Sequence, residues 1–548
     1  MKFSRRTTFP VHIGPVTIGA DNPVAVQSMT STSTMDTPGS VAQIERIVDA
    51  GGQIVRLTAQ GEREARNLEL IRAQVREDGY DVPLVADIHF NPKAAFAAAS
   101  RVEKVRINPG NFVDPGRVFK KIEFTDEEYA EEIKKIERTL VPLLDICKTN
   151  STALRIGVNH GSLSDRIMSR YGDTPAGMVE SALEFLRVCM AHDFRDVVVS
   201  IKASNVCVMT ETVRRMADAM DAEGMPFPLH LGVTEAGDAE DGRIKSAVGI
   251  GSLMLQGLGD TIRVSLSEEP ECEIPVANEI IAYINSVTEC ADPVFEGAVA
   301  EDFDKYAPTR RPSSWSGKVP QVVGLDIPES ALADALTITP ADDYAAKLAE
   351  MQKDPTRIVV ASADGANGIL SLYGLMHQLR ADKVQNPVIV KRTYADPNPI
   401  IPASIDFGLL LLNGFSDGIW LDALHSPHST LHSSLELSIL QATRQRISKT
   451  EFISCPSCGR TLYDLQSTLR DIKAATSHLK GLKIGVMGCI VNGPGEMADA
   501  DYGYVGAGPG RVSLYKGKEC IVKNIPTSEA IPRLIDLIKE NGDWVDPE

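Results

Sequence analysis

Three cysteines near the C-terminus have the residue type and spacing of a metal-binding set. Two of them form Cys455-Pro-Ser-Cys458, and the third, Cys489, begins a turn-rich stretch that ends at Glu496. Cysteine thiolates near such turns bind zinc or iron–sulfur clusters, and either group usually takes four protein ligands. The sequence therefore predicts a non-cysteine fourth ligand, or an iron that is left open for chemistry.

The fourth ligand helps to decide between zinc and an iron–sulfur cluster. The histidine of this region, His478, lies in the middle of the segment between the cysteines. Glu496 is the better candidate, because the turn at 492–495 can direct its carboxylate back towards Cys489. Zinc bound by three thiolates favours Cys or His as its fourth ligand, whereas a carboxylate suits a labile position on one iron. The residues thus favour an iron–sulfur cluster and leave zinc as the alternative.

A second set of residues lies at the ends of apolar runs in the first half of the chain. Because the carboxyl ends of barrel strands meet at one rim, side chains placed there share a site. The residues are Arg56, Asp87, His89, Arg106, Asn108, Arg155, Asn159, Lys202, Thr234, Glu235, Arg263 and Ser265. Each cation alone could pair with a neighbouring carboxylate, but the set contains too few carboxylates for all five. Arginine and lysine bind phosphate oxygens, so the pattern predicts a phosphorylated ligand.

Three features of this region leave two interpretations open. The Glu235 carboxylate, beside Thr234, is either a salt-bridge partner of a neighbouring cation or a positioned general acid. His89 either donates to a hydroxyl or phosphate of the ligand, or is a satisfied histidine of the core. The pair Gly249-x-Gly251 lies where barrels often build phosphate sites, although close helix packing explains it equally well.

The elements that must position these residues alternate between short apolar runs and helical periodicity. The apolar runs are 24–29, 53–58, 83–89, 104–110, 154–159, 196–204, 228–235 and 261–266. Parallel βα units in this number and length predict a closed (β/α)8 TIM barrel, with a doubly wound sheet as the alternative. We expect a hairpin at 9–18 to plug the barrel floor. Residues 113–150 read as a charged helical insertion between the fourth and fifth units.

The whole chain is predicted to be α/β, in three domains. Residues 1–288 form the TIM barrel that binds the substrate, and 289–447 form an inserted smaller α/β domain, partial-barrel-like, with a structural role. Residues 448–548 form an α+β iron–sulfur domain. The strands expected in the insert are 321–327, 357–363, 387–393 and 407–413, and a Pro-, Asp-, Arg- and Ser-rich linker precedes them.

Composition excludes several classes of function. The 548 residues carry 56 Lys and Arg against 74 Asp and Glu, a net charge of −18, which disfavours nonspecific binding to nucleic acid or an anionic membrane. There is no apolar run long enough for a membrane span, and the N-terminus lacks the apolar core of a secretory signal. Six of the nine cysteines are scattered singly, so we expect them reduced and the protein cytoplasmic.

Short motifs across the barrel and the last domain resemble a known enzyme family. They are VQSMT at 26–30, VADIHF at 85–90, RINPGN at 106–111, RIGVN at 155–159, SIKAS at 200–204, HLGVTEAG at 230–237, RVSL at 263–266, CPSC at 455–458 and GCIVNGPGE at 488–496. Together they are similar to the 4-hydroxy-3-methylbut-2-enyl diphosphate synthase family of the non-mevalonate isoprenoid pathway.

The resemblance implies a cofactor, a substrate and an electron donor. The cofactor is a 4Fe-4S cluster held by Cys455, Cys458, Cys489 and Glu496, and Glu496 is the ligand that a substrate atom replaces. The substrate is 2-C-methyl-D-erythritol 2,4-cyclodiphosphate, whose ring opens by two-electron reduction with loss of a hydroxyl as water. Ferredoxin or flavodoxin supplies the electrons.

The same resemblance implies roles for the residues of the barrel. Glu235 becomes the proton donor. The implied substrate-binding residues are Arg56, His89, Arg106, Arg155, Asn159, Lys202, Thr234, Arg263 and Ser265.

The residues 289–447 depart from the two-domain members of the family. Those members close a site between the barrel of one chain and the cluster domain of its dimer mate, so a homodimer is one expected state. Longer members, including plant ones, carry an inserted domain. Our hypothesis is that the insert is a spacer that replaces scaffold otherwise supplied by the second subunit.

Other functions fit part of the same evidence. A non-redox iron–sulfur dehydratase of a phosphorylated substrate would need no external electrons. A non-catalytic iron–sulfur sensor, or a zinc-stabilised phosphate-binding protein, would show no turnover. The absence of a C-x3-C-x2-C motif argues against a radical S-adenosylmethionine enzyme.

Overall fold

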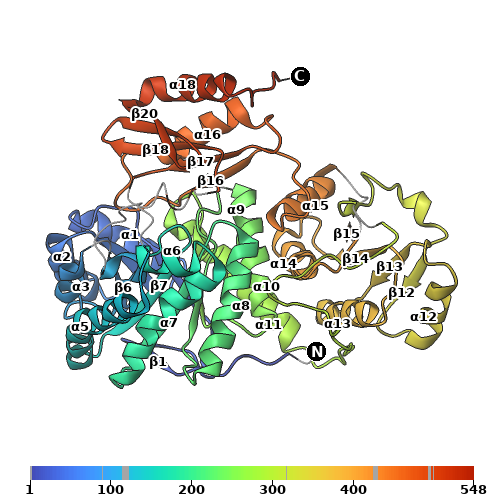
Figure 1. The fold of residues 1–548 in the computed structure, drawn as a ribbon, viewed down its shortest axis with the longest axis horizontal. Helices are drawn as coiled ribbons and strands as arrows, with labels where there is room; N and C mark the ends of the chain where they lie inside the picture. The colour runs from blue at the N-terminus through green and yellow to red at the C-terminus, as the bar shows by residue number, and fades with distance from the viewer. Residues whose placement is uncertain are drawn as a thin grey trace. The chain divides into compact units, whose positions relative to one another are not determined.

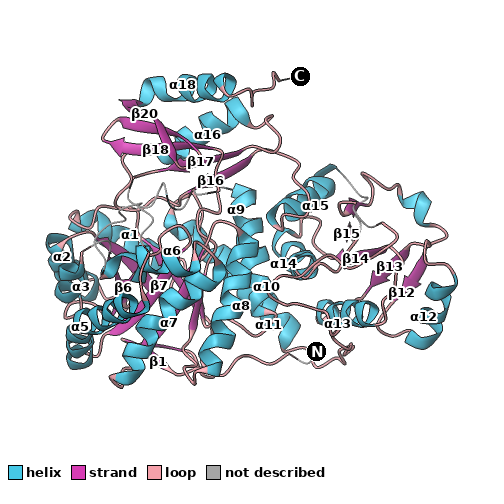
Figure 2. Cartoon of the chain, viewed as in Figure 1, coloured by secondary structure: helices cyan, strands magenta, loops and turns pink. Residues whose placement is uncertain are grey.

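The computed structural model describes residues 3–88, 91–113, 123–237, 239–315, 318–423, 430–490, 495, 497 and 499–547; Figure 1 and Figure 2 show its fold. The chain divides into two compact units. The first comprises Thr7–Gly242, Gly259–Asn278 and Lys449–Glu548, and the second comprises Met1–Arg6, Arg243–Leu258 and Glu279–Ser448. Among the described segments, no helix combines the length and apolar character that a membrane span needs. The predicted three-domain boundaries stay a prediction.

Eight parallel strands close into a barrel in the first unit. Their order around the barrel follows the chain, and Thr261 in the last strand pairs with Ala25 in the first. The strands are β3 (Ala25–Met29), β4 (Ile54–Ala59), β5 (Leu84–Ile88), β6 (Lys104–Ile107), β7 (Ala153–Asn159), β8 (Val197–Lys202), β9 (Leu229–Leu231) and β10 (Thr261–Ile262). Their residues are buried on both faces, as parallel strands covered by helices require. The predicted (β/α)8 barrel is confirmed.

Helices alternate with these strands. They are α1 (Thr37–Asp49), α2 (Glu62–Glu77), α3 (Pro92–Ala98), α4 (Pro109–Phe112), α5 (Asp126–Asn150), α6 (Asp165–Tyr171), α7 (Pro175–Ala191), α8 (Val206–Ala222), α9 (Ala239–Ser246), the π-helical η1 (Ala247–Gly251), α10 (Ser252–Met254), the 3-10 turn η2 (Pro270–Cys272) and α11 (Glu273–Thr288). Polar residues begin several of them: Asp36 accepts a hydrogen bond from the Gly39 N–H, and Thr174 from that of Gly177, both at 3.1 Å. Such caps satisfy backbone donors that the first helical turn leaves open.

A hairpin closes the barrel floor, as predicted. It consists of β1 (Val11–Ile13) and β2 (Val16–Ile18), joined at Gly14, whose φ of 55° is readily adopted by glycine. Its buried side chains pack against residues near the starts of barrel strands, namely Ala25, Ile54, Val85, Ala153 and Val198. The opposite rim is thereby left for the site.

The predicted insertion between the fourth and fifth βα units contains the long helix α5. Thr125 caps it, and the Thr125 backbone N–H donates to a Glu128 carboxylate oxygen at 2.8 Å. One face of α5 is buried through residues such as Leu140 and Leu144. The described part of the insertion is therefore an amphipathic helix.

The second unit contains an open sheet of five parallel strands in the order β11-β15-β14-β13-β12. The strands are β11 (Gln321–Val322), β12 (Leu336–Ile338), β13 (Val359–Ser362), β14 (Val388–Tyr394) and β15 (Gly418–Ala423), and the helices are η3 (Glu329–Leu332), α12 (Tyr344–Lys353), α13 (Gly368–Ala381), α14 (Ile400–Leu412) and α15 (Thr430–Ala442). Strands β12 to β15 lie side by side in chain order, as in part of a (β/α)8 barrel.

One predicted strand of this unit is wrong. Residues 407–413 end the helix α14, and the strand that follows is β15. Helix α14 is buried on nearly all sides, so its apolar residues give no periodicity that separates a helix from a buried strand. Part of this burial is close packing on η1: a Cβ added to Gly251 would lie 2.4 Å from the Ile405 side chain. The Gly249-x-Gly251 pattern therefore serves helix packing.

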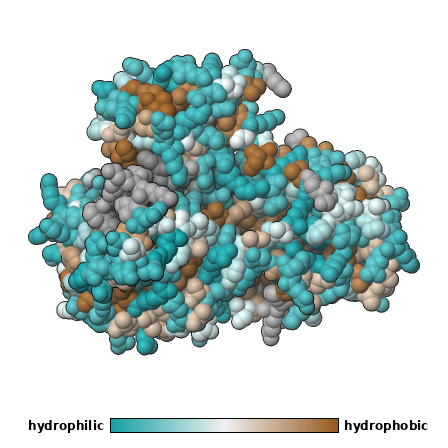
Figure 3. Space-filling model, in the orientation of Figure 1, coloured by the Kyte–Doolittle hydropathy of each residue, from teal (hydrophilic) through white to brown (hydrophobic). Residues whose placement is uncertain are grey.

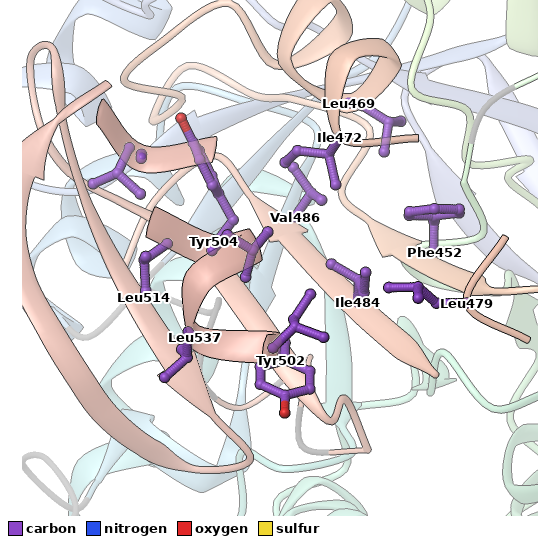
Figure 4. Packing of buried hydrophobic residues seen from close by; sticks show 14 residues of the cluster. Phe452, Leu469, Ile472, Leu479, Ile484, Val486, Tyr502, Tyr504, Leu514 and Leu537 are labelled. Carbon is purple, nitrogen blue, oxygen red and sulfur yellow. The ribbon is translucent and has the colours of Figure 1, made fainter. Parts of the chain in front are cut away.

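The C-terminal domain is an α+β layer within the first unit. Its sheet runs β16 (Glu451–Ser454), β17 (Lys483–Met487), β18 (Tyr502–Gly508), β19 (Arg511–Lys516) and β20 (Glu519–Pro526), parallel for the first three strands and antiparallel for the last three. Helices α16 (Leu465–Thr476) and α18 (Thr527–Glu540) complete the domain. Figure 4 shows the core between sheet and helices, which includes Ile472, Val486, Tyr504 and Leu537. The face seen in Figure 3 is mostly hydrophilic, with small apolar patches.

Candidate functional site

One pocket in the first unit is lined by residues of both predicted sets; Asn108, a described member of the first set, is not in the lining and donates to Ser162 Oγ instead. From the barrel it is lined by Met29, Arg56, Asp87, Arg106, Arg155, Asn159, Lys202, Thr234, Glu235, Arg263 and Ser265. From the C-terminal domain it is lined by Cys455, Pro456, Ser457, Cys458, Arg460, Thr461, Met487, Gly488 and Cys489. Residues of one chain thus bring the strand-end cations and the three cysteines together.

The five cations of the pocket, which we name the cation rim, are Arg56, Arg106, Arg155, Lys202 and Arg263. Four lie on strands β4, β6, β7 and β8, and Arg263 follows β10 directly. Register keeps them near one another, because Arg106 pairs with Arg155 across β6 and β7. All five are buried, with 6% exposure or less. Burying charge at this density is costly unless an opposite charge is present.

Two members of the cation rim already have carboxylate partners. Arg106 Nη1 lies 3.1 Å from Asp87 Oδ1, and its Nη2 donates to Asn159 Oδ1 at 3.0 Å. Arg263 donates through Nη2 and Nε to the two oxygens of Glu273, at 2.9 and 3.1 Å. This two-point pairing makes Arg263 partly structural, which the sequence did not predict.

The other three members lack a salt bridge to any described residue. Arg56 donates to the weak acceptor Met29 Sδ, through Nη2 at 2.8 Å and Nε at 3.0 Å. Nε and Nη1 of Arg155 are buried without a hydrogen-bond partner among the described groups. Lys202, at the end of β8, likewise has no ion pair in the described segments. These three side chains have the donors and the charge to receive an anion.

The electrostatics of the cation rim agree with that interpretation. Burial, opposed by Asp87 and assisted by the neighbouring Arg263 and Arg106, lowers the pKa of Arg56 to about 10. Burial also lowers the pKa of Lys202 well below its usual value, with Arg56 and Arg263 adding to the effect. A bound phosphate would stabilise the charged forms of both side chains.

Glu235 lies between the cation rim and the cysteines. It is 3% exposed, its φ of 48° is in the left-handed region, and it accepts a hydrogen bond from Thr234 Oγ1. Burial is the main influence on the pKa values of Lys202 and Cys455, and the charge of Glu235 raises both. The Glu235 carboxylate is therefore close enough to Lys202 and to Cys455 to act electrostatically on both.

The three cysteines lie at the ends of parallel strands in the C-terminal domain. Cys455 directly follows β16, and Cys458 lies three residues later. Cys489 follows β17 after one intervening residue, Gly488. The Gly488 N–H donates to Cys455 Sγ at 3.3 Å, and burial raises the pKa of the Cys455 thiol. Three soft sulfur donors in a pocket with backbone N–H support fit an iron–sulfur cluster, because metal binding stabilises the thiolate that burial disfavours. No three His, Cys, Asp or Glu residues that could hold a single metal ion occur in the described ranges.

Sequence reasoning missed Arg460 and Thr461. Arg460 Nε donates to Cys458 Sγ at 3.3 Å, and Thr461 Oγ1 accepts a hydrogen bond from the Cys458 N–H at 3.1 Å. Both line the pocket. The available signal was their position directly after the Cys-x-x-Cys pair, where a cation can act on a thiolate.

Direct contacts join the C-terminal domain to the barrel rim. Ser267 Oγ and Ser454 Oγ lie 2.8 Å apart, and Ala236 forms a parallel β-bridge with Ser454. A Cβ added to Gly459 would lie 2.5 Å from the Thr32 carbonyl oxygen. The two domains therefore meet so closely that backbone contacts backbone. Two predicted site residues, His89 and Glu496, lie outside the described residues.

Comparisons with known proteins bear on both domains. A family model described as the GcpE TIM-barrel domain matches residues 8–278, and one described as the GcpE protein C-terminal domain matches 451–540. A Bacteroides fragilis protein is 52% identical, with 99% of this chain and 97% of that protein covered. Relatives from Porphyromonas gingivalis (47% identical; 99% and 98% covered) and Akkermansia muciniphila (41%; 100% and 98%) are similar over the same extent. All three are named 4-hydroxy-3-methylbut-2-en-1-yl diphosphate synthase (flavodoxin).

Proposed function

We propose the following function on the premise that the chain belongs to the GcpE family, which its two matched domains and its full-length relatives establish. The protein is an iron–sulfur oxidoreductase of isoprenoid biosynthesis. It converts 2-C-methyl-D-erythritol 2,4-cyclodiphosphate into 4-hydroxy-3-methylbut-2-enyl diphosphate. One observation carries the proposal: the cation rim and the three cysteines line one pocket.

The reaction consumes two electrons and two protons. The bond between a ring carbon and a phosphate oxygen breaks, which frees the diphosphate chain, and a hydroxyl leaves as water with a double bond formed. Reduced flavodoxin is the proposed donor, since the relatives carry that word in their names; ferredoxin is the alternative.

The cofactor would be a 4Fe-4S cluster held by Cys455, Cys458 and Cys489, with Glu496 as the proposed fourth ligand. When bound, the cluster supplies the electrons, and an iron with an exchangeable ligand supplies Lewis-acid assistance. The protein's part is to hold that group against the substrate and to exclude water from it. The place of Cys455 in the pocket lining and the N–H donated by Gly488 support this assignment.

The cation rim would bind the diphosphate. Arg56, Arg155 and Lys202 supply charge that no described carboxylate neutralises, so they are the proposed primary contacts. Arg106 and Arg263 keep carboxylate partners and would add positive potential and orientation. Asn159, Ser265 and, from outside the described residues, His89 are proposed to bind the same ligand. Electrostatic groups fixed in advance pay little reorganisation energy when the substrate binds.

Glu235 would hold the proton that the leaving hydroxyl receives. Two observations support this role: Thr234 donates a hydrogen bond to the Glu235 carboxylate, and the carboxylate lines the same pocket as Lys202 and Cys455. A general acid must lie within hydrogen-bonding distance of the departing oxygen.

The inserted domain is proposed to act as a spacer that lets one chain complete the site.

The test is turnover of the cyclic diphosphate by anaerobically purified protein. Iron and sulfide are quantified first, and the product is identified by mass spectrometry with reduced flavodoxin, with reduced ferredoxin and without a reductant. We expect product only with a reductant. A dehydrated product at the oxidation level of the substrate, formed without a reductant, would favour the non-redox dehydratase, whereas a colourless zinc protein without turnover would refute both.

A further inference from the structure

Arg460 lies at the junction of the cysteine set and the cation rim. It is 9% exposed, its Nε donates to Cys458 Sγ at 3.3 Å, and its Nη1 is buried without a hydrogen-bond partner among the described residues. A guanidinium carries five N–H donors in a rigid fork. One edge of the group is therefore occupied by sulfur while another is unused inside the pocket.

Arg460 lines the same pocket as Arg56 and Asp87 of the barrel and as the three cysteines. Its own charge lowers the pKa of Arg56. Arg460 is thus an electrostatic neighbour of the rim's β4 cation and shares the pocket with the cysteines.

The backbone fixes Arg460 in this position. The residue before it, Gly459, sits so close to the barrel that a Cβ there would lie 2.5 Å from the Thr32 oxygen and 2.9 Å from Thr58 Oγ1. The residue after it, Thr461, accepts a hydrogen bond from the Cys458 N–H. The backbone is thus fixed on both sides of Arg460, and this preorganisation lowers the entropy lost when a ligand binds.

We propose that Arg460 is an anion-binding residue supplied by the C-terminal domain: its free Nη1 edge donates to a phosphate oxygen of the substrate while Nε stays on the Cys458 sulfur. The identity of the substrate rests on the proposed function. Because one side chain contacts both groups, it links the bound substrate to the cysteine set, and its positive charge stabilises extra electron density at Cys458.

Binding and redox measurements on the holoenzyme test this role. The cyclic diphosphate is titrated calorimetrically without reductant into the wild type and into Arg460→Gln, Arg460→Lys and the matched control Arg470→Gln, whose side chain is 77% exposed. Loss of a charge-assisted hydrogen bond is expected to weaken binding by roughly 10- to 100-fold in Arg460→Gln. Arg460→Lys keeps the charge and should lose less, and Arg470→Gln should bind as the wild type does.

A spectroscopic redox titration of the same samples provides the second readout. Arg460→Gln should shift the reduction potential of the cluster to a more negative value, and Arg460→Lys should not. Wild-type affinity in an Arg460→Gln protein with full iron content would overturn the proposal, as would equal weakening in Arg470→Gln. Loss of the cluster from both Arg460 variants would identify a purely structural role and also overturn it. Failure of the wild type to bind the cyclic diphosphate would instead refute the proposed function.

Discussion

Single residues of the pocket divide the cation rim into paired and unpaired members. Asp87 and Glu273 neutralise Arg106 and Arg263, whereas Arg56, Arg155 and Lys202 face the pocket without a described carboxylate within salt-bridge distance. Burial of these three unpaired side chains disfavours their charged forms, and a bound anion would offset this unfavourable free energy. This imbalance makes binding sensitive to protonation.

Lys202 should take up protons when the substrate binds. Burial lowers its pKa in the free pocket, and a bound phosphate raises it. Between those two pKa values, binding adds protons, so affinity should fall as pH rises. Titrating the cyclic diphosphate without reductant, in buffers of different ionisation enthalpy, measures the uptake. The uptake should disappear in Lys202→Arg, which stays charged, and proton release by the wild type would contradict the assignment.

Glu235→Gln should remove the proton donor without disturbing the site. We expect kcat to fall by about 10²- to 10⁴-fold, the usual contribution of a general acid, while iron content and substrate affinity change little. Steady-state kinetics and calorimetry separate these effects. Thr234→Val, which deletes only the orienting hydrogen bond, should cause a smaller loss. A Glu235→Gln enzyme with nearly wild-type kcat would exclude the role.

The sequence predicted much of this site because the residues follow simple rules of position. Strand-end placement identified the cations, and spacing identified the cysteines. The pairing of Arg263 with Glu273 escaped prediction, because Glu273 begins a helix and strand-end rules do not reach it. Arg460 escaped prediction because the spacing of metal ligands gives no information about a cation that contacts one of them.

Among the elements, the loop that carries Cys458 and Arg460 depends on the glycine between them. The φ of Gly459 lies outside the left-handed region, so its own backbone accepts alanine, but the added Cβ would collide with Thr32 and Thr58. Gly459→Ala should therefore keep its cluster and lose activity. A misplacement near 1 Å can cost about 10²-fold in kcat/KM. Gly508→Ala, whose Cβ would meet nothing closer than 3.9 Å, is the matched control, and equal losses in both variants would refute this account.

The stability of the region around helix α13, in the second unit, should decrease at acid pH. The His377 ring lies 4.6 to 4.8 Å from those of Phe303, Tyr373 and Phe415, neither nitrogen has a described partner, and burial lowers its pKa to about 4. Since the folded pKa is below the unfolded value, this contribution to stability is present above pH ~6.5 and is lost as pH falls.

The expected loss is about 2 kcal/mol between neutral pH and pH 5. Urea unfolding, followed by hydrogen exchange of α13, measures it. His377→Phe keeps the aromatic packing and should flatten this acid dependence. An unchanged dependence in the variant would show that other groups cause it.

Element prediction succeeded where helices and strands differ in their pattern and failed where they do not. The eight barrel strands are short apolar runs buried on both faces, and the helices between them are amphipathic, so the two kinds of element can be told apart in the sequence. Residues 407–413 are apolar on every side because α14 is buried nearly all round. The short strand β12 was missed since its three residues give no measurable period.

At the scale of the whole molecule, we infer that one chain builds the reductive site. The pocket and the contacts of Ser454, Gly459 and Ala236 all belong to a single compact unit of the chain. A site shared between two chains would instead tolerate damage to the barrel of one and the cysteines of the other. The two arrangements therefore differ in how defective chains complement each other.

Co-expression of Lys202→Ala with Cys489→Ser, each differently tagged, tests that claim most directly. The first variant retains the cysteines and the second retains the cation rim. Turnover of the cyclic diphosphate with reduced flavodoxin is measured for the wild type, for each variant and for the doubly tagged complexes or mixed chains. We predict an active wild type and mixtures as inactive as the variants alone. Recovery of turnover in the mixture would contradict a site built within one chain.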